Sequence, residues 1–169
     1  MSAEPNSESE SAIRKQMAEQ AQETFASALN AVTWALLRKP DRTPADNEKM
    51  LYAAFASAYH FLEIGSALEQ QRASWLISRV YSVLGNGQEA VSHAQRCMEL
   101  TEQHAAELAD FDKAFAFEAW ARANAVAGKA TEAAKYRKLA ENAGESIEDE
   151  ESRKVFTEEL TSGNWHGVA

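Results

Sequence analysis

The sequence predicts an all-α protein built from stacked antiparallel helix hairpins. Only seven glycines and three prolines occur in 169 residues, and no proline follows position 44, so long helices are permitted through most of the chain. Apolar residues recur at helical spacing, and the alternation typical of strands is absent. A register of 43 residues also relates segments 71–103 and 114–144, and a fixed period of this kind is typical of stacked helix pairs that share a core.

The register rests on residues of the same kind at equivalent places. Gly85 and Gly128 lie 43 residues apart, and so do Ala90 and Ala133. In each segment a helical stretch ends at the glycine, and a second stretch follows with the alanine five places on. We expect both glycines to have positive φ at a helix end and both alanines to be buried between paired helices. The same spacing separates three large apolar residues, Trp34, Ile77 and Trp120.

The N-terminal part of the chain predicts a leader followed by a long helix. Residues 1–10 are rich in serine and glutamate, so we expect a disordered leader before a single helical domain over 11–161. A first helix is predicted over 11–38. It ends before Pro40 because proline disfavours helical geometry at the residue that precedes it.

Local start and stop signals define the second helix. Thr43 can cap its N-terminus, Pro44 suits the first helical position, and Asp46 can accept a hydrogen bond from the cap amide. This helix is predicted over 44–64, and Gly65 ends it.

The remaining helices are delimited in the same way. Glycines at positions 85, 128 and 144 end three of them, and the pairs Asn86 with Glu89 and Ser146 with Asp149 begin two. The last helix carries many charges and few apolar residues, which suits a C-terminal capping helix on about three helix pairs. The final residues, 162–169, are predicted to form a flexible tail. The five helices are predicted over 67–84, 86–104, 112–127, 131–142 and 146–160.

Both segments resemble the tetratricopeptide repeat (TPR). In that family a helix with a large residue, an aromatic residue and a turn glycine precedes a helix with an early and a late small residue. The equivalent residues are Tyr81, Gly85, Ala90, Ala94 and Cys97 in the first segment, and Phe117, Trp120, Gly128, Ala133 and Ala140 in the second. The spacing exceeds that of the family and Asn124 replaces a usual aromatic, so the chain is TPR-like. As a whole it also resembles a family of small, mostly uncharacterised bacterial helical proteins, which implies no activity.

Composition narrows the function classes. The net charge of −9, without any run of Lys or Arg, argues against nucleic acid as a partner. Cys97 is the only cysteine, so no intramolecular disulfide can form. The N-terminus lacks the basic start and apolar run of a secretory signal, and no apolar stretch approaches the roughly 20 residues that span a membrane. We therefore expect a cytoplasmic protein with no membrane partner.

The resemblance also indicates where a partner would bind. The first helix of each pair lines the concave side of a TPR-like stack, and a second polar and aromatic face appears on the helices predicted over 67–84 and 112–127. The candidate concave face comprises Arg72, Trp75, Arg79, Phe115, Glu118 and Arg122. Arginine presents a planar fork of donors that suits a carboxylate or phosphate. The alternative is structural: Arg72 or Arg79 pairs with Glu118, and Trp75 belongs to the core.

The histidines and the cysteine give weaker indications of a functional site. His93 and Cys97 share a helix face, but two ligands do not make a metal site, and Cys97 occupies a place where the repeat buries a small residue. His60 lies among aromatic residues, where a packing role is the more common one. The sequence has no nucleophile elbow, phosphate loop or zinc helix. We therefore expect no enzyme activity, no cofactor and no metal.

The sequence thus favours a protein- or peptide-binding module that uses the concave face of a helical stack. The alternative is a small-molecule-binding protein with a pocket between the helix pairs, lined by His60, Arg72, Trp75, Arg79 and Glu118. The sequence does not identify the partner, and it leaves self-association open.

Overall fold

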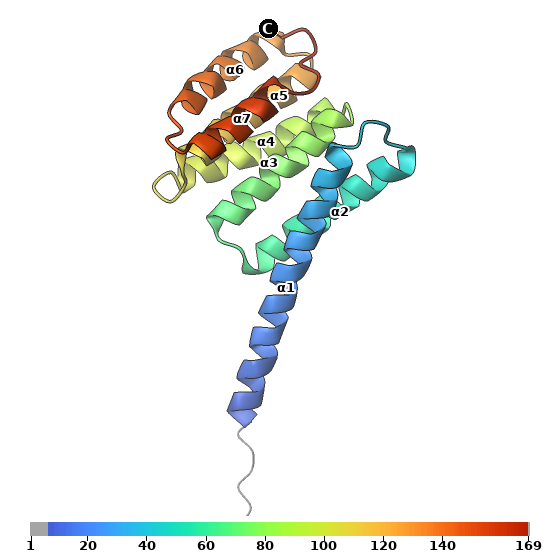
Figure 1. The fold of residues 1–169 in the computed structure, drawn as a ribbon, viewed down its shortest axis with the longest axis vertical. Coiled ribbons are helices and arrows are strands. Elements are labelled where there is room, and N and C mark those ends of the chain that lie inside the picture. The colour runs from blue at the N-terminus through green and yellow to red at the C-terminus, as the bar shows by residue number, and fades with distance from the viewer. Residues whose placement is uncertain (1–6, 169) are drawn as a thin grey trace, which may run out of the picture.

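The computed structural model describes residues 7–168, and within them it contains seven helices and no strand (Figure 1). The all-α prediction is therefore confirmed. Neighbours in the chain are neighbours in space: α1 packs against α2, α3 against α4, α5 against α6, and successive pairs stack through α2–α3 and α4–α5 contacts. The helices are α1 (Ser7–Leu37), α2 (Pro44–Ile64), α3 (Ala67–Val83), α4 (Gly87–Gln103), α5 (Asp110–Val126), α6 (Ala130–Glu145) and α7 (Glu150–Thr161).

Local hydrogen bonds fix α2 where the sequence predicts it. The Thr43 hydroxyl accepts a hydrogen bond from the Asp46 backbone N–H at 3.2 Å, and the Asp46 carboxylate accepts one from the Thr43 backbone N–H at 2.8 Å. Pro44 is the first helical residue and Ile64 the last. This reciprocal pair satisfies two N–H groups that the first helical turn leaves without partners.

The two turn glycines have the same geometry. Gly85 has φ +77° and Gly128 has φ +75°, as predicted. The backbone N–H of Asn86 donates to Tyr81 at 3.0 Å, and that of Lys129 donates to Asn124 at 2.9 Å, so both helices end in the same six-residue hydrogen-bonded loop. Glycine is required at these points because L side chains rarely adopt positive φ.

The small residues that follow each turn lie where paired helices approach closely. Ala90 and Ala133 are both completely buried, and so are Cys97 and Ala140 later in α4 and α6. The burial of the two alanines is therefore confirmed.

Enlarging Ala133 to leucine is expected to destabilise the protein by about 1–3 kcal/mol, because the side chain has no room between α5 and α6. Ala134→Leu is the matched control, since this neighbour is exposed and should tolerate the same change. Chemical denaturation of both variants measures the difference. Equal stabilities would show that the site can absorb the added volume.

Three boundaries differ from the prediction by more than two residues. The first helix begins at Ser7, so residues 7–10 are helical, whereas the rest of the predicted leader lies outside the described residues. The sixth helix continues through Gly144 to Glu145. A Cβ at Gly144 would lie 2.3 Å from the Phe156 ring, so this glycine serves a close approach to α7 and does not end the helix. The cap of α7 is Asp149, whose side chain accepts a hydrogen bond from the Ser152 N–H at 2.7 Å.

The residues after α7 also pack, although the sequence predicts a flexible tail. Trp165 and Val168 are 8% and 7% exposed. The Trp165 ring lies between two guanidinium groups, 4.1 Å from that of Arg122 and 4.5 Å from that of Arg137. Arg137 also donates a 2.7 Å hydrogen bond to the Val168 carbonyl. Cation–π contacts and hydrogen bonds of this kind hold a segment that composition alone marks as loose.

The core is continuous through the C-terminal five helices, and a smaller cluster joins α2 to α3. In Figure 1 the N-terminal half of α1 projects beyond the rest of the molecule, while α7 lies in front of α5 and runs alongside it. The aromatic contact between Phe156 and Phe115, 5.0 Å between ring centroids, ties α7 to α5.

Candidate functional site

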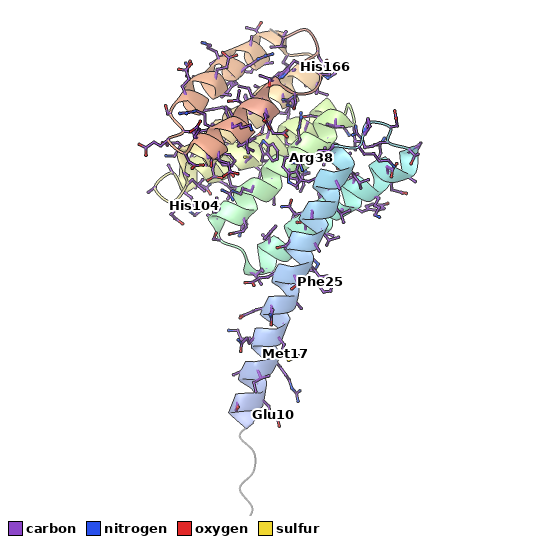
Figure 2. All side chains as sticks on the ribbon, in the orientation of Figure 1. Glu10, Met17, Phe25, Arg38, His104 and His166 are labelled. Carbon is purple, nitrogen blue, oxygen red and sulfur yellow. The ribbon has the colours of Figure 1, made fainter. Side chains whose placement is uncertain are left out.

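A groove runs along α3, with α1 on one side and α7 and the following residues on the other. It consists of two adjoining hollows of about 480 and 260 Å³, and both are lined by Trp34, Arg38 and Glu159. We call it the α1–α7 groove. Arg38 lies at the upper end of α1 in Figure 2. The larger hollow is also lined by Leu37, Arg42, Arg79, Ser82, Val83, Gly85, Arg122, Ser162, Gly163, Asn164 and His166, and the smaller by Asn30, Gln71, Arg72, Trp75, Leu76, Phe111, Asp112, Phe115 and Val155.

The predicted candidates fall along this groove. Arg79 and Arg122 line the larger hollow, while Arg72, Trp75 and Phe115 line the smaller one. The sixth candidate, Glu118, is 1% exposed and is not among the lining residues of either hollow. It lies beneath the groove and contacts two of the others.

Trp75 is a floor residue of the groove. A place on the candidate concave face would leave the Trp75 side chain partly exposed, but Trp75 is only 6% exposed, so that expectation is wrong and the alternative that places Trp75 in the core is confirmed. Its indole N–H donates to Glu118 at 2.9 Å, across a separation of 43 residues in the chain. Its ring stacks on Trp34 at 5.4 Å and meets the Phe115 ring edge-on at 4.9 Å. Trp34 of α1 therefore covers a ring that the sequence leaves open.

Arg122 and Glu118 form a buried ion pair. The Arg122 Nε donates to Glu118 at 2.5 Å, and the two side chains are 2% and 1% exposed. The other guanidinium nitrogens donate to the backbone carbonyls of Glu159 at 3.0 Å and Ser162 at 3.1 Å. Arg122 thus donates to two backbone carbonyls at the C-terminal end of α7, where its positive charge complements the helix dipole.

Arg79 occupies the floor of the larger hollow with fewer partners. Its Nη2 donates to the Ser162 hydroxyl at 3.2 Å and lies 3.5 Å from a Glu159 carboxylate oxygen. Burial lowers the pKa of Arg79, while the Glu118 carboxylate acts in the opposite direction. The Ser82 hydroxyl beside it is buried and has no hydrogen-bond partner among the described residues.

Arg72 is the accessible member of the set. Its Nε donates to Asp112 at 2.7 Å, but its side chain stays 53% exposed. The guanidinium lies 5.8 Å from the centre of the Phe111 ring. Asp112 itself is buried, so this pair anchors one end of the groove without removing Arg72 from solvent.

The structural alternative holds in a different form. Glu118 pairs with Arg122 of its own helix, whereas Arg72 pairs with Asp112 and Arg79 with Glu159. The spacing of Glu118 and Arg122, four residues on one helix, was a signal for this pair. Other residues of the groove were missed because they come from elements outside the repeated segments. These include Trp34 of α1, Arg38 just after α1 and the residues after α7, whose position no local pattern reveals.

The remaining histidines and the cysteine have packing environments. His60 contacts the Gln22 side chain and stacks on Phe25 at 5.5 Å, so it lies away from the groove and outside the pocket proposed for a small molecule. His93 lies between Phe55 and Tyr81, at 5.5 and 5.7 Å, and burial lowers its pKa. Burial also disfavours the charged form of the Cys97 thiol, and it therefore raises the pKa of that group. Within residues 7–168 no three acidic, His or Cys side chains gather as a metal site would require.

Comparisons with known proteins assign neither a family nor a function to the chain. No protein-family model matches the chain, and neither a curated protein nor a solved structure was found to be similar to it. None of the helices in the described part of the chain combines the length and apolarity that crossing a membrane requires.

Proposed function

We propose that this protein is a non-catalytic module of TPR-like helix hairpins that binds an acidic segment of a partner protein in the α1–α7 groove. The observation that carries the proposal is the charge of the groove. Five arginines line it against two acidic residues, Asp112 and Glu159, in a chain whose net charge is −9. A local excess of arginine on an acidic protein favours an anionic partner and repels a basic one.

The arginines differ in how far they are available. Arg122 is committed to Glu118 and to α7, and Arg42 donates to carbonyls at the end of α1. Arg38, by contrast, is exposed, and its side chain has no hydrogen bond or ion pair within the described residues; its guanidinium lies 5.0 Å over the Trp34 ring. Arg38 therefore lines both hollows and Arg72 lines the smaller one. Both guanidinium groups can donate hydrogen bonds to a carboxylate of the partner.

The apolar lining suits a peptide rather than an isolated ion. Trp34, Phe111 and Val155 border the smaller hollow between the charged groups. A segment that alternates acidic and apolar side chains would satisfy both kinds of surface. The acidic groups of the groove are each held by an arginine, at 2.7 Å for Asp112 and 3.5 Å for Glu159, and for that reason we assign them no catalytic step.

Arg38→Ala is expected to weaken binding of an acidic peptide by roughly tenfold, the equivalent of about 1.4 kcal/mol for one charged hydrogen bond. The probe is a labelled, end-blocked peptide of alternating Glu and Leu, followed by fluorescence anisotropy. Added salt should weaken the same interaction because exposed charges are screened.

Two controls make this test specific. Arg96→Ala removes an exposed arginine of α4 that lines a different hollow, and it should leave binding unchanged. A peptide with Lys in place of Glu should not bind. Equal binding of both peptides, or no effect of Arg38→Ala and Arg72→Ala together, would contradict the proposal.

A small polycarboxylate is the second candidate ligand. The larger hollow, about 480 Å³, lies within the usual size of small-molecule pockets, roughly 300–1,000 Å³. Citrate that displaces the labelled peptide at low concentration, and binds more tightly than the peptide itself, would favour this candidate.

A further inference from the structure

Among the described residues, none packs against the part of α1 from residue 9 to residue 21 and buries it. Every residue from 9 to 21 is exposed, and Figure 2 shows Glu10 and Met17 on the part of α1 that projects from the molecule. Two ion pairs within the helix support it, Arg14 with Glu10 and Lys15 with Glu19. A lone helical segment of this length is marginal in water, because most helical stability in proteins comes from packing an apolar face.

This segment begins a ridge of apolar side chains. Residues at intervals of four, from position 13 to position 29, form one inclined row on the helix surface, and all five are apolar. Among the large members Met17 is 65% exposed, Phe25 56% and Ile13 54%. We call this row the α1 ridge; it comprises Ile13, Met17, Ala21, Phe25 and Leu29.

The α1 ridge continues into an apolar surface on the first hairpin. Leu29 borders an outer hollow of about 390 Å³ between α1 and α2, which Val32 and Tyr52 also line. Tyr52 is 65% exposed and Tyr59 is 56% exposed. The hairpin that begins the stack therefore presents to solvent the kind of face that a terminal unit normally makes polar.

Two properties of the α1 ridge indicate what covers it. Its five positions are symmetric about Ala21, so the same row read in the opposite direction places Met17 against Phe25 and Ile13 against Leu29. The smallest side chain stands at the centre, where two crossing helices approach most closely. The segment 9–21 also carries two acidic and two basic residues, so two copies approach there without the repulsion expected of a chain of net charge −9.

We infer that a second copy of this chain packs on the α1 ridge, so that two α1 helices cross antiparallel at Ala21. Rows at intervals of four from two helices interdigitate at a crossing angle of about −50°. By helical periodicity Glu19 and Glu23 lie on the opposite side of α1 from Ala21, so like charges are kept apart. The contact is isologous, with the same patch used by both copies, and it closes as a dimer. The α1–α7 groove lies on another side of α1, so this inference does not rest on the proposed function.

The first test compares Met17→Glu with Gln16→Glu in the full chain. Both substitutions add one negative charge at adjacent exposed positions, but only Met17 belongs to the α1 ridge. Light scattering coupled to gel filtration, over a range of concentrations, should give a dimer for the wild type and for Gln16→Glu and a monomer for Met17→Glu. A wild type that stays monomeric throughout, or a Met17→Glu variant that stays dimeric, would overturn the inference.

The second test uses the two-fold axis itself. A residue at the crossing faces its own copy, so Ala21→Cys should form an intermolecular disulfide under mild oxidation, because two Cα atoms at a close crossing fall within disulfide range. Ala28→Cys should not, since two copies of this residue lie about 21 Å apart along antiparallel helices. The native Cys97 is buried and does not compete. Equal cross-linking of both variants, or none with Ala21→Cys, would overturn the crossing point.

Discussion

Replacing Glu118 by alanine is expected to lower the free energy of unfolding by about 3–5 kcal/mol, because it breaks a buried ion pair. The Arg122 side chain, 2% exposed in the intact protein, would lose its carboxylate partner, and the Trp75 indole N–H would lose its acceptor. An uncompensated buried charge is far more costly than the ion pair is stabilising. Chemical denaturation monitored by circular dichroism measures the loss.

Two further variants separate the causes. Glu118→Gln keeps an acceptor for Trp75 but removes the charge, so its loss should be intermediate. Glu118→Leu combined with Arg122→Met removes both charges and should be less destabilising than Glu118→Ala alone. Glu99→Ala breaks an exposed pair with Arg96 and should cost at most about 1 kcal/mol. A Glu118→Ala variant as stable as Glu99→Ala would show that water reaches Arg122.

Local chemistry explains how much of the fold can be predicted. The start of α2 and the turns at Gly85 and Gly128 depend on hydrogen bonds among residues close in sequence, so their signals are complete in the chain itself. Gly144 is a glycine like Gly85 and Gly128, yet it lies inside α6. There the Phe156 ring from α7 fills the space that a side chain would take. Whether a glycine ends a helix or admits a neighbour is decided by tertiary contacts.

The candidate site, too, has a part that the sequence predicts and a part that it does not. Helical periodicity brings Trp75, Arg79, Phe115 and Arg122 to one face, and that face does line the groove. Periodicity does not reveal what lies above the face. An amphipathic helix such as α7 has to bury one side, but its sequence alone does not determine which surface receives it.

The position of α7 links stability to the groove. Its last turn contributes Glu159 to both hollows, and the carbonyls of Glu159 and Ser162 are held by Arg122. The groove wall is therefore only as rigid as the attachment of α7 to α5 and α6. Ser162, Asn164 and His166 extend that wall beyond the helix.

Phe156→Ala is expected to remove this attachment and to cost about 3–5 kcal/mol. The ring is 1% exposed, meets Phe115 edge-on at 5.0 Å and lies against the bare backbone of Gly144, so truncation leaves a cavity that the helices cannot readily close. Denaturation should show the loss. Hydrogen exchange should show it first in the amides of α7, while α3 and α4 keep more of their protection because α7 packs chiefly on α5 and α6.

Val155→Ala is the control for the loss of α7 packing. Val155 is the preceding residue of the same helix and is 45% exposed, so its truncation should change stability by no more than about 0.5 kcal/mol.

Because Glu159 and Arg122 lose their fixed geometry only when α7 detaches, Phe156→Ala should also weaken binding of the acidic peptide, although Phe156 itself does not line the groove. Unchanged exchange in α7 after Phe156→Ala would mean that the arginine contacts at its C-terminal end hold the helix without the aromatic anchor.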